Sequence, residues 1–172
     1  MLTLKVKSEA ECFMVAFSSP VDAIKWCHVV QEALLVANWP ERLLSIDKCS
    51  ERMSRDGRII FRGPAVRMGM HLGHPECKEN PITSRIDYHG PSVNKSSRIL
   101  GLAMGGQVLV SELVWLRAQK DEFLRDNSLV TTLGKYVLRG FQVGSPSPLS
   151  PRWTRTFSCR CCPGPSPTGA SR

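Results

Sequence analysis

A break in composition after residue 141 limits which part of this chain can fold. The segment 142–172 consists largely of Ser, Pro, Arg and Cys, and it holds six of the chain's 12 prolines. Such a segment cannot bury enough apolar surface to offset the entropy lost on ordering. We therefore predict one folded domain over residues 1–141, followed by a disordered tail over 142–172 that cannot supply a regular closing strand.

The charge of the chain is divided between these two parts. The formal net charge is +8, and the tail carries four arginines and no acidic residue. The domain therefore holds 8 − 4 = +4. Without a clustered basic face interleaved with aromatic residues, this charge does not indicate a nucleic-acid partner.

Cysteine usage and hydropathy indicate in which cellular compartment the protein is found. Seven cysteines occur without metal-type spacing, and "CRCC" at 159–162 lacks a C-x-x-C pair, so we expect reduced thiols. No window approaches the roughly 18 apolar residues of a membrane span. We predict a cytoplasmic protein with no transmembrane segment of its own, which a partner or larger parent protein could hold at the membrane surface.

The N-terminal half combines a hairpin with a long helix. "LTLKVK" and "CFMVAF" predict two strands joined by residues 8–11, with the second strand buried on both faces. Apolar residues then recur at helical spacing from Pro20 to about residue 37. Residues 41–63 are charged and contain an Asp56-Gly57 turn signal, which indicates an excursion with a small hairpin.

The second half alternates strands and helices. "AVRMGMHLG" at 65–73 alternates like a half-buried strand, "PECKENPIT" at 75–83 indicates a loop, and "QVLV" at 107–110 indicates a buried strand. We predict helices from Pro91 to about residue 103 and from a Ser111 cap to about residue 119, then two strands around Gly134. This irregular order favours the α+β class.

The stretch "SRIDYHGPSVNKSSRIL" at 84–100 places Asp87 before a Gly-Pro break and Asn94 and Arg98 after it. Asn94 and Arg98 are four residues apart, so they share one face of the predicted helix. A phosphate near the start of that helix would meet unpaired N–H groups and a guanidinium. On spacing alone, solvent-facing helix residues are the simpler interpretation.

Three segments together carry a family resemblance. They are "CFMVAFSSPVDAIKWC", "VRMGMHLGHPECKENPITSRIDYHGPSVNKSSRI" and "GGQVLVSE", and they resemble the catalytic domain of class III nucleotidyl cyclases over about residues 3–141. The pattern D-Y-x-G-x-x-V-N-x-x-x-R is highly specific. The excursion at 41–63 and "PITSRIDYHGPSVN" are most similar to the large Ras-regulated adenylyl cyclases of fungi. The resemblance implies a ferredoxin-like cyclase fold, a mostly antiparallel sheet with helices on one face.

The resemblance also implies roles for five residues. Lys7 and Asp87 would read adenine, Asn94 would hold the ribose, and Arg98 would stabilise charge on the α-phosphate. Arg139 lies where the family usually has a lysine that contacts the terminal phosphates. Adenine offers a donor beside an acceptor, and guanine presents the reverse order, so an Asp and Lys pair favours ATP over GTP.

The sequence departs from the family where metal is bound. Class III cyclases use two Mg²⁺ ions, for which Mn²⁺ can substitute, held by two aspartates. The first belongs to a strand that, with two helices, precedes the hairpin, and this sequence lacks that segment. At the second position stands Glu11, after Ala10 in place of glycine; its extra methylene moves the carboxylate, while Mg²⁺ demands near-ideal octahedral geometry. We therefore expect a domain that is inactive alone, as either a truncated copy or an imperfect gene model of a larger enzyme.

The leading interpretation is an adenylyl cyclase catalytic domain of intracellular signal transduction, which converts ATP to cyclic AMP and pyrophosphate. Family members build the site across a dimer, so a second cyclase domain is the expected partner and would supply the metal ligands. Two alternatives stay open. One is a non-catalytic regulatory partner that dimerises with an intact cyclase, and the other is a non-functional fragment.

Overall fold

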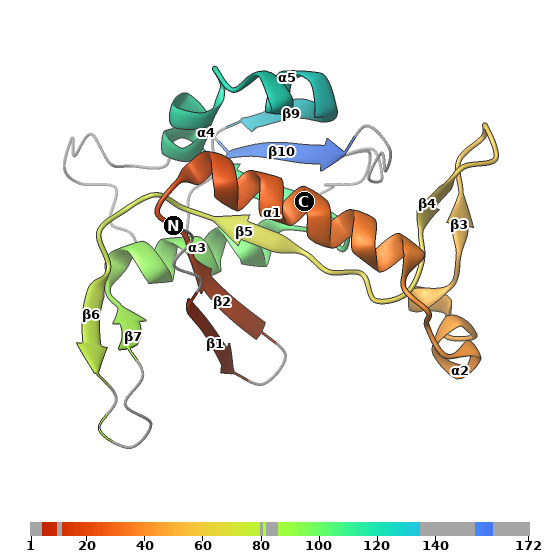
Figure 1. Cartoon of the computed structure of the whole chain (residues 1–172), viewed down its shortest axis with the longest axis horizontal. Coiled ribbons are helices and arrows are strands. Elements are labelled where there is room, and N and C mark those ends of the chain that lie inside the picture. The colour runs from red at the N-terminus through yellow and green to blue at the C-terminus, as the bar shows by residue number, and fades with distance from the viewer. Residues whose placement is uncertain (1–4, 10–11, 80, 82–85, 135–153, 160–172) are drawn as a thin grey trace.

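A four-stranded sheet forms the centre of the protein in a computed structural model (Figure 1). The structure describes residues 5–9, 12–79, 81, 86–134 and 154–159, and for 5–9, 134 and 154–159 it describes the backbone alone. The strand order is β5-β8-β10-β9. β5 (Met68–Met70) runs parallel to β8 (Val108–Ser111), whereas β10 (Thr154–Cys159) is antiparallel to both β8 and β9 (Ser128–Gly134).

Helices cover both faces of this sheet. Val108 and Val110 pack with α1 (Pro20–Val36), α4 (Glu112–Ala118) and α5 (Glu122–Asn127), while Leu109 packs with α3 (Pro91–Leu102). Successive side chains of a strand point to opposite faces, so α3 lies across the sheet from α1. The expectation that the helices share one face is therefore wrong for α3. The even burial of β8 is typical of a strand covered on both sides.

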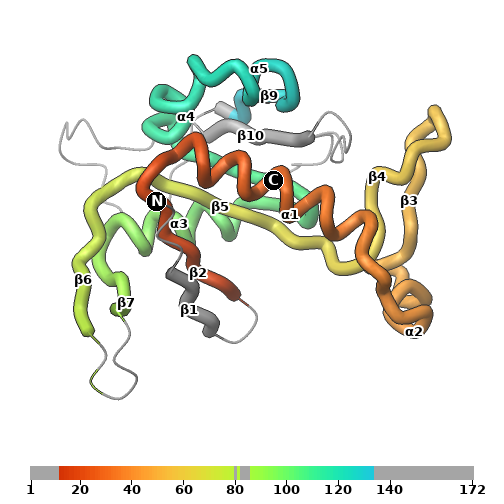
Figure 2. The backbone as a smooth tube through the Cα atoms, in the orientation of Figure 1, coloured from red at the N-terminus to blue at the C-terminus, as the bar shows by residue number. Residues whose placement is uncertain are grey.

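Three two-stranded ribbons surround the central sheet. They are β1 (Lys5–Glu9) with β2 (Cys12–Ala16), β3 (Arg52–Met53) with β4 (Ile59–Phe61), and β6 (Glu76–Glu79) with β7 (Ile86–His89). The tube in Figure 2 shows the β3–β4 and β6–β7 ribbons at opposite ends of the molecule. Five of the six described strand pairings are antiparallel, which confirms the predicted mostly antiparallel α+β class.

Several local predictions are confirmed. The hairpin at the N-terminus forms, and α1 begins at Pro20 behind Ser19, whose hydroxyl accepts a hydrogen bond from the Asp22 N–H. The excursion contains α2 (Glu41–Leu44), the short 3₁₀ helix Asp47–Cys49 and the predicted hairpin, with Gly57 at a φ of 74° in its turn. Local turn and cap signals were sufficient here because these contacts are short-range.

Three further predictions, each about a local segment, are wrong. Residues 76–79 form the strand β6 instead of a loop, because β7 lies alongside to pair with them. The strand β2 is not buried on both faces: β1 is its only partner among the described strands, and Phe13 is 73% exposed. In the segment expected to be a disordered tail, residues 154–159 form β10 between β8 and β9, where two ladders satisfy its backbone.

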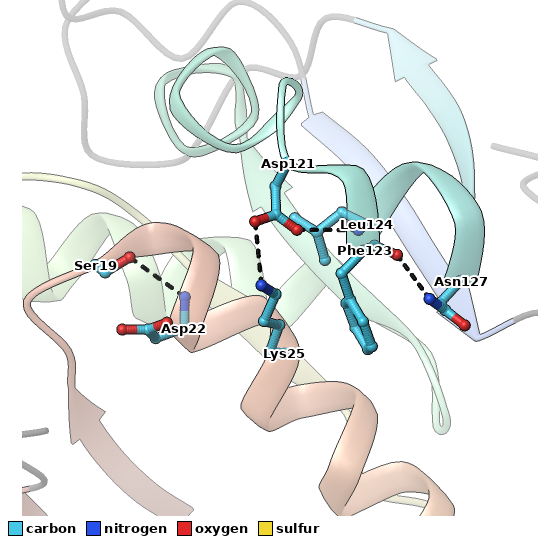
Figure 3. Close-up of polar contacts among 7 residues, drawn as sticks. All are labelled: Ser19, Asp22, Lys25, Asp121, Phe123, Leu124 and Asn127. Atoms are coloured by element: carbon cyan, nitrogen blue, oxygen red, sulfur yellow. Dashed lines mark hydrogen bonds and ion pairs between the residues drawn. The ribbon is translucent and has the colours of Figure 1, made fainter.

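Polar contacts join α1 to α5 at the edge of the core (Figure 3). Lys25 Nζ donates to Asp121 Oδ2 at 3.1 Å, and Asp121 Oδ1 accepts from the Leu124 N–H at 3.1 Å as the cap of α5. Burial alone would raise the pKa of Asp121, but these hydrogen bonds outweigh it and the pKa lies below its ordinary value. Asp121 therefore fixes the start of α5 against α1.

Candidate active site

Three of the predicted site residues lie on one continuous unit of the fold. Asp87 is in β7, and Asn94 and Arg98 are in α3, which begins immediately after that strand and packs against it. Asp87 is half-buried, whereas Asn94 and Arg98 are exposed. The motif therefore places a carboxylate, a carboxamide and a guanidinium around a single strand-to-helix turn.

The turn itself depends on Gly90. Its φ of 104° and ψ of −175° fall in a region that only glycine adopts readily. Pro91 follows at the first helical position, and the Asn94 N–H donates to the Gly90 oxygen at 3.1 Å. A Cβ on Gly90 would lie 3.7 Å from the Glu76 side chain, so β6 lies close to the start of α3.

The inner face of α3 anchors the helix to the sheet. Ile99 is fully buried, and Ser96 Oγ donates to the Gly69 oxygen at 3.0 Å. Asn94 and Arg98 lie on the opposite side of the helix, toward solvent. The sheet thus presents these two side chains outward on a rigid support.

The ribbon β6–β7 brings further charges beside Asp87. Lys78 is directly opposite Asp87 in the ladder, and Glu76 is opposite His89. Residues opposite one another in a ladder point to the same face. Lys78 Nζ also lies 3.9 Å from Glu76 Oε2. Sequence reasoning missed Lys78 because 75–83 lacks strand alternation.

For the other three predicted residues the structure describes at most the backbone. Lys7 pairs with Met14 in the β1–β2 ribbon, and only its backbone is described. Glu11 and Arg139 lie outside the described residues. Their roles stay predictions from the resemblance.

His71, in the stretch 65–73, is a further residue of interest near α3. It is half-buried, and its Nδ1 lies 3.0 Å from the Ser111 hydroxyl oxygen. Burial and, to a lesser extent, the positive charge of Lys95 lower the pKa of His71 to about 4. His71 is therefore neutral at physiological pH.

The described residues do not fit a resident metal ion. In ranges 12–79 and 86–134 no group of three His, Cys, Asp or Glu side chains could hold one. Magnesium therefore remains an expectation for this chain, and no step of the chemistry below runs through it.

None of the described helices combines the length and apolar character needed to cross a membrane.

Comparison with known proteins decides the family. The family model described as "Adenylate and Guanylate cyclase catalytic domain" matches residues 2–145. The chain belongs to this family. Over 108 residues this cyclase domain is 46% identical to an adenylate cyclase of Mycosarcoma maydis. The aligned residues make up 63% of this chain and 4% of that relative. Over 107 residues it is 45% identical to an adenylate cyclase of Neurospora crassa, and the aligned residues make up 62% of this chain and 5% of that relative.

Solved structures support the same assignment. Adenylate cyclases from Trypanosoma brucei, solved in their monomeric state, match this cyclase domain with a TM-score of 0.70 at 25% identity. The match covers 94% of this chain and 73% of the trypanosome chain. The domain spans only a small part of its fungal relatives, so their activities enter below as proposals.

Proposed function

We propose that this cyclase domain binds ATP and, together with a second cyclase domain, converts it to cyclic AMP and pyrophosphate. The observation that carries the proposal is the β7–α3 unit, which gathers Asp87, Asn94 and Arg98 around one helix start. Support also comes from several fungal adenylate cyclases, to which the aligned part of the chain is 44–46% identical in sequence.

The three side chains match three parts of the nucleotide. The Asp87 carboxylate accepts a hydrogen bond from the exocyclic amine of adenine, which guanine does not offer at that position. Asn94 provides an amide for the ribose hydroxyls. Arg98, one turn further along the same face, donates to the α-phosphate as the 3′-hydroxyl attacks and pyrophosphate leaves.

The remaining assignments rest on the resemblance. Lys7 completes the reading of adenine, and Arg139 contacts the terminal phosphates. The expected Mg²⁺ ions supply Lewis-acid chemistry when bound. Glu11 keeps a carboxylate at the position of the second metal aspartate, but its extra methylene moves the oxygens from the geometry that Mg²⁺ demands, so in the proposal the second domain provides the metal ligands and this chain alone is inactive.

The test measures cyclic AMP made by the purified chain, alone and mixed with a second catalytic domain. That partner is a fungal adenylate cyclase domain that keeps its metal aspartates but has lost its own base-reading lysine and aspartate. We expect activity only in the mixture. Arg98→Ala should abolish it, while Arg125→Ala, which removes an exposed arginine on α5, should leave it unchanged.

The other outcomes point to the alternatives. A mixture without cyclic AMP, from a chain that melts cooperatively and binds the partner domain, would favour a non-catalytic regulatory subunit. A chain that does not melt cooperatively would indicate a fragment that does not fold.

A further inference from the structure

His71 lies on the face of the sheet that α3 covers. It follows the last residue of β5, and strand alternation places it with Gly69 on that face, opposite Met68 and Met70. Gly69 contacts α3 closely, since a Cβ there would collide with the backbone of Leu100. His71 is therefore two residues from a close contact between the sheet and α3.

Its partner is a buried hydroxyl. Ser111 ends β8 and is 1% exposed. Because β5 and β8 are parallel, with Met70 opposite Val110, His71 and Ser111 come next in the same register. Ser111 is also the N-cap residue of α4, yet its side chain makes no capping hydrogen bond. The Ser111 hydroxyl contacts His71 instead, which corrects the predicted cap.

Contacts on either side of His71 locate it beneath the first two turns of α3. Gly69 accepts from Ser96, and the loop after β5 reaches Ser92, whose hydroxyl donates to the His74 oxygen at 3.4 Å. Lys95, between those two serines, acts on His71 electrostatically. Asn94 is on the outward side of the same turn.

We propose that His71 is a positioning residue for the nucleotide site: the contact with Ser111 fixes the orientation of its ring on the sheet, and the ring supports the first turns of α3 from the side of β5 and β8. The proposal rests on the proposed function, because it concerns how Asn94 and Arg98 are aimed. His71 touches no substrate atom in this role.

The experiment compares His71→Ala, His71→Asn, Ser111→Ala and the double variant His71→Ala/Ser111→Ala, each as the full chain. An asparagine keeps a polar atom near the position of Nδ1. The control is His74→Ala, in the same loop: its exposed side chain makes no hydrogen bond or ion pair within the described part of the chain, and the variant retains its backbone oxygen. The readouts are kcat and KM for cyclic AMP formation in the mixture, affinity for a fluorescent ATP analogue, and cooperative melting.

We expect His71→Ala and Ser111→Ala each to lower kcat about five- to tenfold, the effect of losing one partly buried hydrogen bond. The double variant should lose no more than either single one, since both remove the same contact. His71→Asn should restore most of the activity, and His74→Ala should match the wild type. A kcat effect shows that the transition-state contacts of Arg98 are disturbed.

Two results would overturn the proposal. One is an active wild-type mixture in which His71→Ala folds and keeps its kcat. The other is a double variant whose losses add, which would mean two independent effects. If the wild-type mixture makes no cyclic AMP, the proposed function fails, whatever the role of His71. In that case the affinity for the ATP analogue tests His71 on its own, and an unchanged affinity of His71→Ala rejects the positioning role.

Discussion

The hydroxyl of Ser96 donates to the backbone oxygen of Gly69 across 3.0 Å, so α3 and β5 meet at a residue without a side chain. A Cβ on Gly69 would collide with the backbone of Leu100 in the next turn of α3. The distance of α3 from the sheet therefore depends on Gly69, and with it the place of Asn94 and Arg98.

Replacing Gly69 by alanine should force α3 away from β5. We expect the free energy of unfolding to fall by about 1–3 kcal/mol, the usual cost of overpacking. Urea denaturation measures it. Gly101→Ala is the matched control, since Gly101 is in the same helix with nothing within 4 Å of its Cβ position, and there alanine should stabilise by about 0.5–1 kcal/mol. Equal effects at the two glycines would contradict the close contact.

Gly90→Ala should disturb the start of α3. A residue with a Cβ at φ 104° and ψ −175° is strained by about 1–3 kcal/mol, and the turn would relax by moving Pro91 and the helix. Affinity for a fluorescent ATP analogue should then fall. Gly57→Ala serves as the control, because Gly57 also has a positive φ, 74°, but is in the hairpin turn of the excursion. If both variants bind the analogue equally, the turn does not position the site.

The stability of the domain should depend on pH through His28. This residue is 4% exposed, and its Nε2 lies 3.1 Å from the Ser128 hydroxyl, which links α1 to β9. Burial lowers the pKa of His28, and Glu32 opposes this only in part. The folded pKa is thus below the unfolded value of about 6.5. The stabilising contribution is complete above that value and is lost as pH falls below it, because the unfolded chain then binds more protons.

Urea unfolding at about pH 7.5 and about pH 5.5 tests this. The free energy of unfolding should fall toward the lower pH, by at most about 1.4 kcal/mol per pH unit for one histidine. His28→Gln keeps a polar atom toward Ser128 but does not titrate, so its stability should vary less with pH. His71 contributes with the same sign and should leave a residual slope. His74→Gln, at an exposed position, should follow the wild type. A slope unchanged in His28→Gln would reject the assignment.

Local signals predicted those parts of the fold whose contacts are close in sequence. Ser19 and Pro20 mark the start of α1, and Pro91 marks that of α3. β6 was missed because its apolar pattern is weak and its strand character comes from pairing with β7. The placement of α3 across the sheet from α1 likewise depends on long-range packing of β8.

In the candidate site, too, the residues close in sequence were predicted, whereas those brought together by strand pairing were not. Spacing in the motif was enough to place Asp87, Asn94 and Arg98 on one strand-to-helix unit. Nothing in the spacing pointed to Lys78 opposite Asp87 or to His71 beside Ser111, because each pair joins two strands. The alternation of 65–73 did place His71 and Gly69 on the same face, and this was the signal available.

The strand β10 lies between two strands, β8 and β9, that do not pair with each other. Its ladder joins Thr156 to Leu109 of β8 on one side and to Thr131 of β9 on the other. Without β10, β9 would have no described partner in the sheet, and one edge of the fully buried β8 would lose its hydrogen bonds.

Thr156→Pro should therefore destabilise the whole domain, since proline removes the backbone donor and is not tolerated in a central strand. We expect a melting temperature lower by several degrees, at about 2–4 °C per kcal/mol for a chain of this size. Thr156→Val, which keeps the backbone N–H and the shape of the side chain, is the matched control and should melt close to the wild type. If Thr156→Pro also melts like the wild type, β10 contributes nothing to stability and the tail is dispensable for folding. A cooperative loss confined to Thr156→Pro would mean that a segment with the composition of a disordered tail completes the central sheet.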